Sequence, residues 1–472
     1  MKRRDVLRWG AGLVSGVLGP WVRRDPLRTE SVRAPGSGLR TSERVLVVGA
    51  GASGLAAARR LVSEFGLSAP GQVVVLEARD RIGGRVHTDS SLSIPVDLGA
   101  SWIHGPRGNP IAELAEEFGV RTVATSEDQE VYDEDGSKVS WLEQGTSISR
   151  YGSAYDRVQA HVAGLAADQS LAQSFVDVGA DGGAKPKAKR LFHWWAHNLL
   201  ESGWTAYTSQ LSSRHHDMGA EFGGSDRVFP GGYSQIVDGL ARGLDVRMEH
   251  VVEAIEYGAE GVTVRTDRGT FEADRCTVTL PLGVLKAGSV AFSPELPDGL
   301  RGAIGRMGFG AVYKLALEFE RAFWNAKPTC LSMVSSKRQH VDWFNTLEYT
   351  DVPILTTWAC QDLARSLESM PPDDAVARVM QDLRKIYGNG TPDPIRTCAS
   401  SWISSPFTGG SYSFPAVGST PADYDEFGLA VGDRLLFAGE HTSSDHPATV
   451  HGAYLSGRRA AERAISVAKS AR

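Results

Sequence analysis

The chain has 472 residues, enough for two or three domains, and 42% hydrophobic with 22% charged residues is typical of a globular protein with a large core. The net charge of −6 comes without a concentrated basic stripe in the body of the chain, which argues against a nucleic-acid partner. Four cysteines, Cys276, Cys330, Cys360 and Cys398, are widely spaced and form no Cys-x-x-Cys pair. We therefore expect core thiols and predict no bound metal.

The first segment, residues 1–42, resembles a twin-arginine export signal followed by a linker. The basic residues Lys2, Arg3 and Arg4 precede a modestly apolar, glycine-rich stretch over residues 9–19. This stretch is too short to span a bilayer as an ordinary helix, so we expect no membrane span in the mature protein. The pattern predicts export to the periplasm, cell envelope or extracellular space. A disordered basic tail on a cytoplasmic protein is the alternative.

The first predicted strand, Val45–Val48, is a run of apolar residues that leads into a glycine-rich turn. The glycines Gly49, Gly51 and Gly54 allow a tight turn, a close backbone approach to a pyrophosphate and close packing of the next helix. We expect that helix to begin near Leu55. Its free N–H groups and positive dipole end would face the phosphates.

A second predicted strand, Val73–Leu76, ends at Glu77, which is placed to accept hydrogen bonds from a ribose hydroxyl. Strand, glycine turn, helix and acid occur in the order of a dinucleotide-binding unit, and Gly83, Gly84 and Arg85 follow shortly after. The pattern predicts a site for FAD. A glycine-rich turn in an ordinary α/β unit is the alternative.

Related strand patterns recur in the middle and at the end of the chain, which predicts a discontinuous domain. We assign residues 43–105, 227–291 and 398–468 to an FAD-binding domain. Residues 106–226 and 292–397, which are richer in aromatic residues and helical patterns, form the predicted substrate-binding domain. Further expected elements are helices at 234–240 and 449–467, strands at 262–266, 276–280 and 435–438, and an exposed loop at 179–189.

Further distinctive motifs lie at residues 77–85, 97–105, 281–286, 310–314, 410–413, 437–442 and 450–454. These separate motifs resemble those of the flavin-dependent amine oxidase family, in particular polyamine oxidases, spermine oxidases and lysine-specific histone demethylases. The likeness covers most of residues 43–468. It implies an α/β fold with a doubly wound, Rossmann-like FAD domain and a substrate domain in which helices flank a mixed sheet.

The resemblance also implies how FAD would be held. It places the glycines and Glu77 on the ADP half, Arg85 near the pyrophosphate, Val252 by the adenine and Glu440 at a second ribose or ribityl contact. Ser411 stands where monoamine oxidases carry the cysteine that bonds the flavin, so we expect non-covalent FAD. The predicted cofactor-binding residues are Gly49, Gly51, Ala52, Ser53, Gly54, Glu77, Ala78, Arg79, Gly84, Arg85, Gly99, Ala100, Ser101, Trp102, Val252, Pro281, Trp402, Gly439, Glu440, Thr449 and Val450.

Four residues match catalytic positions of the family. Lys314 corresponds to a lysine that holds a water next to flavin N5, although a snorkelling surface lysine is the alternative. Tyr412 matches a tyrosine that packs against the substrate amine, and Thr449 stands where monoamine oxidases carry a second tyrosine. The substrate amine would thus be enclosed by one tyrosine ring instead of two, which favours longer or secondary amines. His104 matches a histidine at the substrate channel, with a packed, backbone-bonded histidine as the alternative.

The activity implied is oxidation of a polyamine or secondary amine by hydride transfer to flavin N5, with imine hydrolysis and reduction of O2 to H2O2. Trp102 and its neighbours replace the arginine that amino-acid oxidases of related fold usually carry, which argues against a carboxylate substrate. The alternatives are an L-amino-acid or other flavin oxidase and a non-catalytic flavin-binding envelope protein. Glu201 and Glu221 are candidate acids for a distal ammonium, and exposed surface carboxylates are the alternative for both.

Overall fold

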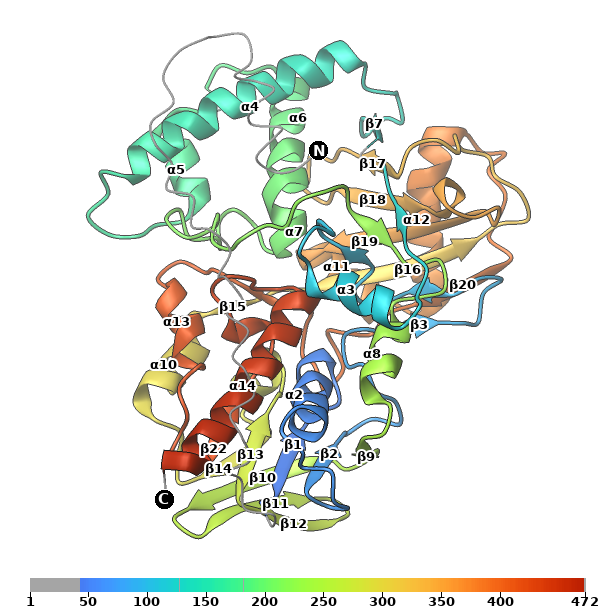
Figure 1. The fold of residues 1–472 in the computed structure, drawn as a ribbon. Coiled ribbons are helices and arrows are strands. Elements are labelled where there is room, and N and C mark those ends of the chain that lie inside the picture. Colours follow the sequence, from blue (N-terminus) through green and yellow to red (C-terminus); the bar gives the residue numbers. More distant parts are fainter. Residues whose placement is uncertain (1–42, 127, 181, 471–472) are drawn as a thin grey trace.

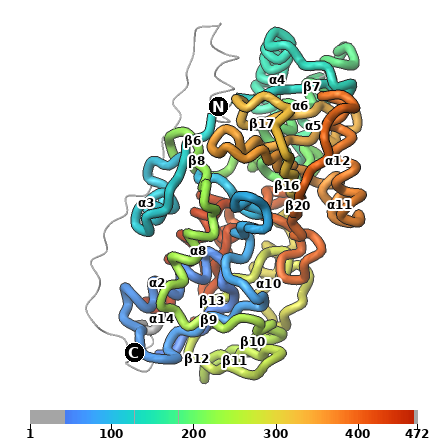
Figure 2. The backbone as a smooth tube through the Cα atoms, turned by 90° about the vertical axis from the view of Figure 1, so that its right-hand side faces the viewer, coloured from blue at the N-terminus to red at the C-terminus, as the bar shows by residue number. Residues whose placement is uncertain are grey.

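The computed structural model describes residues 43–470, apart from residues 127 and 181. The export signal and linker predicted for residues 1–42 lie outside this described part. The described chain forms two halves, a lower one with a parallel sheet and an upper one with helices and a mixed sheet (Figure 1). The side view separates the same two halves (Figure 2).

The parallel sheet of the lower half is buried on both faces. Side chains alternate across β1, so Val45 and Val47 pack in one hydrophobic cluster, while Leu46 and Val48 pack in another. Helices α2 (Ala52–Ser63) and α14 (Val450–Ser470) pack together against the first face. The sheet order is β22 (Leu435–Phe437), β13 (Arg275–Val278), β1 (Val45–Val48), β2 (Val73–Leu76) and β9 (Asp245–Arg247).

A four-stranded sheet covers the second face of the parallel sheet. Its apolar residues Val252, Ile255, Val262 and Val264 belong to the same cluster as Leu46. Helix α10 (Asp298–Arg306) also contributes to that cluster. The four strands, in sheet order, are β12 (Gly269–Ala273), β11 (Gly261–Thr266), β10 (Val252–Gly258) and β14 (Ala291–Ser293).

The upper half contains the predicted mixed sheet. Its strands are antiparallel except at the edge, where β7 pairs in parallel with β17. Helices α11 (Gln361–Ser369) and α12 (Pro372–Tyr387) pack on one face. The order is β20 (Arg396–Ala399), β16 (Val312–Glu318), β19 (Ile354–Cys360), β18 (Val341–Asn345), β17 (Cys330–Met333) and β7 (Gln129–Tyr132).

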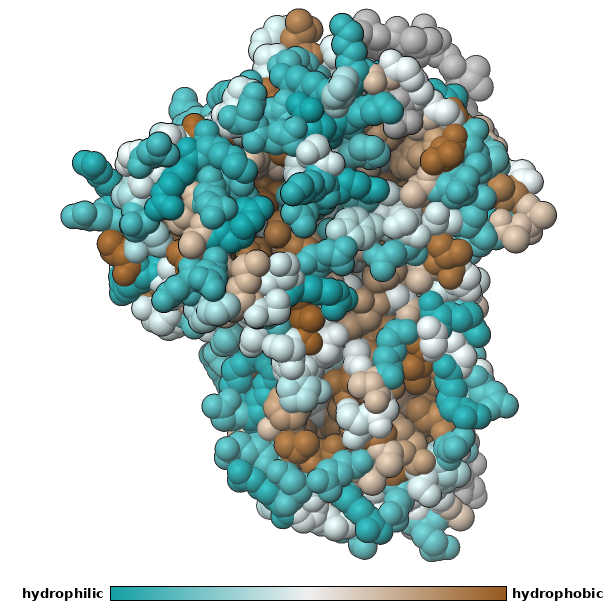
Figure 3. Space-filling model, turned by 180° about the vertical axis from the view of Figure 1, so that it is seen from behind, coloured by the Kyte–Doolittle hydropathy of each residue, from teal (hydrophilic) through white to brown (hydrophobic). Residues whose placement is uncertain are grey.

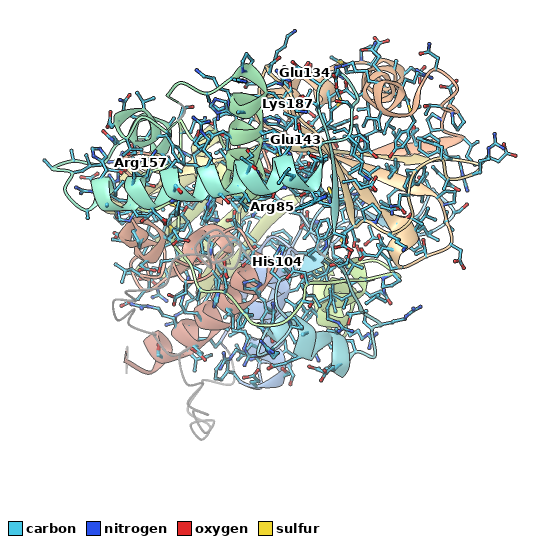
Figure 4. The ribbon with its side chains drawn as sticks, turned by 90° about the horizontal axis from the view of Figure 1, so that it is seen from above. Arg85, His104, Glu134, Glu143, Arg157 and Lys187 are labelled. Atoms are coloured by element: carbon cyan, nitrogen blue, oxygen red, sulfur yellow. The ribbon has the colours of Figure 1, made fainter. Side chains whose placement is uncertain are left out.

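A group of helices stands beside this sheet. Its core contains large aromatic side chains such as Tyr151 and Trp194. The ion pair between Glu143 and Lys187, 2.7 Å long, joins two of the helices, and both residues are labelled near one end of α4 in Figure 4. The helical elements are α4 (Trp141–Val162), α5 (Leu171–Asp177), α6 (Pro186–Ala196), a π-helical turn (His197–Glu201) and α7 (Ser202–Trp204).

The short remaining elements connect these layers. A cis peptide bond precedes Pro294. The strands are β3 (Thr88–Asp89), β4 (Val96–Asp97), β5 (Trp102–Ile103), β6 (Val123–Ala124), β8 (Arg227–Val228), β15 (Gly308–Phe309) and β21 (Ser413–Phe414). The helices are α3 (Pro110–Glu117), α8 (Ser234–Ala241), α9 (Leu282–Ala287) and α13 (Pro421–Glu426), with 3-10 turns at Thr346–Glu348 and Glu440–Thr442.

The α/β fold with two domains is confirmed, and several predicted bounds shift. Helix α2 begins at Ala52, three residues before Leu55, because Gly51 already serves as its N-cap. The loop predicted at 179–189 is wrong in part, since α6 begins at Pro186, a residue whose fixed φ suits the first helical turn. The proposed division into domains stays a prediction, and its boundary at residue 398 falls inside β20.

The surface differs between the two halves. Seen from behind, hydrophilic residues dominate the upper half, whereas more apolar residues show on the lower half (Figure 3). Among the described residues, no helix combines the length and the apolar character needed to cross a bilayer.

Candidate active site

A cavity of about 840 Å³ lies where the parallel sheet faces the mixed sheet. Every predicted cofactor-binding or catalytic residue except Gly54 lines it. A Cβ on Gly54 would collide with the carbonyl of Gly49, so this glycine lets α2 pack closely on the turn. The residues that the sequence predicted thus come from three distant segments of the chain and lie around one cavity.

The glycine turn and Glu77 form the nucleotide end of the cavity. Gly49 has a φ of +104°, a conformation that favours glycine, and a Cβ there would lie 2.6 Å from Oγ1 of Thr279. The buried Glu77 carboxylate accepts hydrogen bonds from the N–H of Ala50 at 2.8 Å and of Arg79 at 3.0 Å. A carboxylate has about four acceptor positions, so Glu77 can also accept a ribose hydroxyl.

An ion pair between the partly exposed Arg85 and the buried Glu440 joins the first and last segments of the chain. Nη1 of Arg85 donates to Oε1 of Glu440 at 2.8 Å and to the carbonyl of Ser411 at 2.7 Å. Oε2 of Glu440 accepts from Oγ of Ser413 at 2.6 Å and from the N–H of Ala448 at 3.1 Å. Burial opposes ionisation of Glu440, but the charge of Arg85 and the hydrogen bond from Ser413 help to keep its pKa below the ordinary value.

The N-terminus of α14 opens on the cavity. Oγ1 of Thr449 accepts from the N–H of Gly452 at 3.0 Å, which makes Thr449 the capping residue of the helix. The same hydroxyl donates to the carbonyl of His446 at 2.9 Å. Thr449 and Val450 both line the cavity. The positive end of the helix dipole therefore faces a ligand bound there.

Lys314 is buried, with 2% of its surface exposed, so the snorkelling interpretation is wrong. Its Nζ donates to the carbonyls of Asp97 at 3.0 Å and Gly99 at 2.6 Å and to Oγ of Ser101 at 2.6 Å. These bonds use all three donors of the ammonium group. Burial lowers the pKa of Lys314, and the nearby Asp97 carboxylate opposes this shift in part. The lysine thus positions the 97–101 segment, a role that the sequence did not indicate.

Three aromatic rings cluster beside Lys314. The ring of Trp102 lies 4.4 Å from that of Phe344 and 6.5 Å from that of Trp358, and Nζ of Lys314 lies 5.2 Å from the Trp358 ring. All three rings and Tyr412 line the cavity. Sequence reasoning missed Phe344 and Trp358, because their place depends on strand register and no linear motif marks them.

His104 lies on the cavity lining with an exposed side chain. Its Nδ1 is 2.7 Å from Oδ2 of Asp226, and the N–H of Gly105 donates to Oδ1 at 3.0 Å. Burial opposes ionisation of Asp226, yet these two contacts keep its pKa below the ordinary value. The packed-histidine interpretation is therefore wrong. Figure 4 labels His104 and Arg85 near the middle of the molecule.

The two candidate acids lie in different environments. Glu201 is fully buried and accepts from Thr208 N–H at 2.7 Å, from the Thr208 hydroxyl at 2.9 Å and from Arg338. Glu201 is not among the residues that line the cavity, so both interpretations given for it are wrong. Glu221 is exposed and lines the cavity. A third acid, Asp342, is buried in the lining and was missed.

The cysteines and histidines form no metal centre in the part of the chain that the structure describes. No group of three or more His, Cys, Asp or Glu side chains there is arranged to hold a metal ion. The free thiols of Cys276, Cys330 and Cys360 are buried and that of Cys398 is partly exposed. Burial raises the pKa of Cys398 to about 12, so this thiol is protonated at neutral pH.

A parallel sheet with a glycine turn and a mixed sheet that meet at one cavity define a two-domain dinucleotide-binding protein. The sequence matches the family described as "Flavin containing amine oxidoreductase" over residues 52–465. The chain belongs to this family, and it is a flavin-dependent amine oxidoreductase. Membership of this family implies FAD as the cofactor. The glycine turn, Glu77 and the pair of Arg85 with Glu440 fit that cofactor, because they offer close backbone approach, a ribose acceptor and a nearby cation.

Similar proteins support the assignment. Polyamine oxidase 2 of Arabidopsis thaliana is 36% identical over 442 residues, which cover 89% of this chain and 88% of that protein. Lysine-specific histone demethylase 1 homolog 1 of the same plant is 34% identical over 97% of this chain, which spans about half (55%) of that protein's length. A structure of putrescine oxidase bound to putrescine superposes with a TM-score of 0.72 over 90% of this chain and 99% of that chain. At 22% identity it supports the fold alone.

Proposed function

We propose that the protein oxidises a polyamine or another secondary amine with FAD and O2, giving an aldehyde, an amine and H2O2. The observation that carries this proposal is the single cavity, which joins the nucleotide end to an aromatic pocket at Lys314 and Tyr412. The similarity to polyamine oxidases, which extends over most of both chains, supports the same substrate class.

The protein's residues prepare the amine and the site. FAD, when bound, would accept a hydride from the carbon next to the amine nitrogen and pass both electrons to O2. An aliphatic amine has a pKa of about 10 in water, so it is largely protonated at neutral pH and its lone pair cannot assist hydride loss. The rings of Trp102, Phe344, Trp358 and Tyr412 exclude water and thereby favour the neutral amine. Water then hydrolyses the oxidised amine.

Other residues of the cavity hold its walls in place and stabilise the bound groups. Lys314 fixes the 97–101 segment, and Thr449 caps the helix whose N-terminus faces the cavity. N–H groups and the helix dipole at that terminus stabilise negative charge on a bound group. His104, held by Asp226, supplies a polar contact near an exposed part of the lining.

We also propose that FAD is bound without a covalent link. Ser411 offers a hydroxyl, which lies 3.4 Å from Oγ1 of Thr205, and no thiol at the position expected for flavin attachment. Acid precipitation of the holoprotein should therefore release the yellow chromophore into the supernatant. Retention of flavin in the washed pellet would contradict this.

For residues 1–42 we propose export by the twin-arginine route. The Arg3-Arg4 pair and the short apolar stretch at 9–19 support this proposal. A bacterial reporter fused to residues 1–42 should be exported only while both arginines are present. Equal export of an Arg3→Lys, Arg4→Lys variant would contradict it.

Peroxide release from a panel of amines tests the activity. The panel contains spermidine, spermine, N-acetylspermine, benzylamine and the common L-amino acids. We expect the polyamines to give the largest kcat/KM. Preferred oxidation of an L-amino acid would replace the proposal with an amino-acid oxidase, and a yellow protein that no amine reduces would indicate a non-catalytic flavoprotein.

A further inference from the structure

A row of side chains crosses the mixed sheet next to the aromatic pocket. The register pairs Lys314 with Trp358, Trp358 with Asp342 and Asp342 with Ser332. Directly opposed residues of antiparallel strands project from the same face of a sheet, so these four side chains share one face. Lys314, Trp358 and Asp342 all line the cavity. The row therefore leads from the predicted catalytic lysine to an acid two strands away.

Asp342 is a buried carboxylate with incomplete charge pairing. Its side chain is 6% exposed, and Oδ1 accepts a hydrogen bond from the hydroxyl of Ser332. Oδ2 lies 3.6 Å from Nε2 of His197, which is beyond hydrogen-bond distance. A buried carboxylate is unfavourable unless a cation or several donors satisfy it. The cavity beside Asp342 is thus a favourable place for a ligand cation.

Of the two histidines near Asp342, His340 supplies no such cation. The rings of His197 and His340 lie 4.9 Å apart. Burial and the neighbouring His197 keep the pKa of His340 well below its ordinary value, so His340 is neutral near pH 7. In the described residues, neither ring nitrogen of His197 has a hydrogen-bond partner.

We propose that Asp342 binds the distal ammonium of a di- or polyamine whose reacting end lies beside Lys314 and Tyr412. This inference rests on the proposed amine oxidation. Strands lie about 4.8 Å apart, so two strand spacings place Asp342 roughly 10 Å from Lys314 along the sheet. That separation fits an extended aliphatic chain between two nitrogens. The rings of Trp358 and Phe344 lie along the way and suit methylene groups or a cation.

Glu221, the other acid that the sequence singled out, also lies in the lining, together with further acids such as Asp217 and Asp226. Its carboxylate is exposed, so water and salt screen its attraction for an ammonium group. Asp342 is shielded from that screening. We therefore expect Asp342, rather than Glu221, to distinguish amines with a second charge from amines without one.

We call Asp342 in this role the anchor. Two probes that differ by a single ammonium group, 1,8-diaminooctane and octylamine, test it. Each is mixed anaerobically with the FAD-loaded protein. The concentration dependence of flavin bleaching gives an apparent Kd and a limiting rate, and inhibition of spermidine oxidation gives Kd where a probe is not oxidised. We expect the wild type to bind the diamine more tightly. Asp342→Asn should raise the Kd of the diamine roughly 10- to 100-fold, as expected for a lost charge-assisted hydrogen bond, and leave octylamine and the limiting rate unchanged.

Two further variants serve as controls. Glu221→Gln removes the exposed acid, and Asp382→Asn removes an equally buried carboxylate that pairs with Arg378 and Lys385 on α12. Both should keep the diamine preference. The anchor is overturned if the wild type shows no such preference, if Asp342→Asn weakens both probes equally, or if Glu221→Gln alone abolishes the preference. In these cases amine oxidation still stands. Flavin that neither probe nor spermidine bleaches removes the proposed function and the anchor together.

Discussion

The nucleotide end and the amine end of the cavity are built in different ways. At the nucleotide end, backbone groups and one ion pair act, and the residues come from short contiguous motifs around Gly49 and Glu440. At the amine end, side chains from β16, β18 and β19 meet through strand register. Substitutions at single strand positions can therefore change the substrate contacts and leave the motifs of the cofactor site intact.

The largest expected effect is at the ion pair of the nucleotide end. Arg85→Met leaves the buried Glu440 without its cation, and we expect the free energy of unfolding to fall by about 3–5 kcal/mol. Urea unfolding of the holoprotein measures this. The control is Arg301→Met, which breaks an exposed pair with Glu295 and should cost less than about 1 kcal/mol. Similar losses in both variants would contradict a special role for the pair of Arg85 with Glu440.

The pH dependence of stability tests the burial of His441, which follows Glu440 at the nucleotide end of the cavity. His441 is buried, and burial lowers its pKa from 6.5 to about 4. Between these values the unfolded chain binds the proton and the folded protein does not, so stability falls as the pH is lowered from 6.5 to about 4. The contribution of this group is about 3 kcal/mol.

Substitution of His441 by leucine removes its contribution to the pH dependence of stability. The wild type should lose more stability than His441→Leu over this pH range, as measured by unfolding free energies at several pH values. Parallel curves for the two proteins would show that His441 does not titrate as its burial predicts.

Lys314 holds the 97–101 segment of the cavity lining beside the aromatic pocket, so its removal should slow the reaction. Lys314→Met leaves the carbonyls of Asp97 and Gly99 without a donor, which should cost about 1–3 kcal/mol of stability. Because the 97–101 segment lines the cavity, its displacement should also slow anaerobic flavin reduction by spermidine, roughly 10- to 100-fold. The control is Lys286→Met, since Lys286 donates to the carbonyl of Gly305 outside the cavity lining. Wild-type rates of reduction and reoxidation in Lys314→Met would show that Lys314 has no role in either half-reaction.

The smallest expected effect is at the cap of α14. Thr449→Val removes the acceptor for the N–H of Gly452 and should lower the free energy of unfolding by about 1 kcal/mol. Thr449→Ser keeps the hydroxyl and should restore most of the loss. A Ser variant as unstable as the Val variant would mean that packing of the threonine methyl group matters more than the cap.

The residues predicted for the nucleotide end lie together in the structure because each belongs to a motif with its own local signal. The apolar strand Val45–Val48, the glycine turn and Glu77 carry their own structural signals. Asp342 and Phe344 carry none, because no linear motif shows which residues of the neighbouring strands they face, and only the register brings Ser332 and Trp358 opposite Asp342. Glu201 was misjudged for a related reason, since a distant residue, Arg338, pairs with it in the interior.

The central claim is that one cavity holds FAD at one end and an oxidisable amine at the other. Anaerobic titration of the FAD-loaded protein with spermidine, followed by absorbance, tests it most directly. The account predicts complete bleaching of the flavin and release of an aldehyde product. A stable yellow spectrum with excess spermidine and with every other amine of the panel would contradict it.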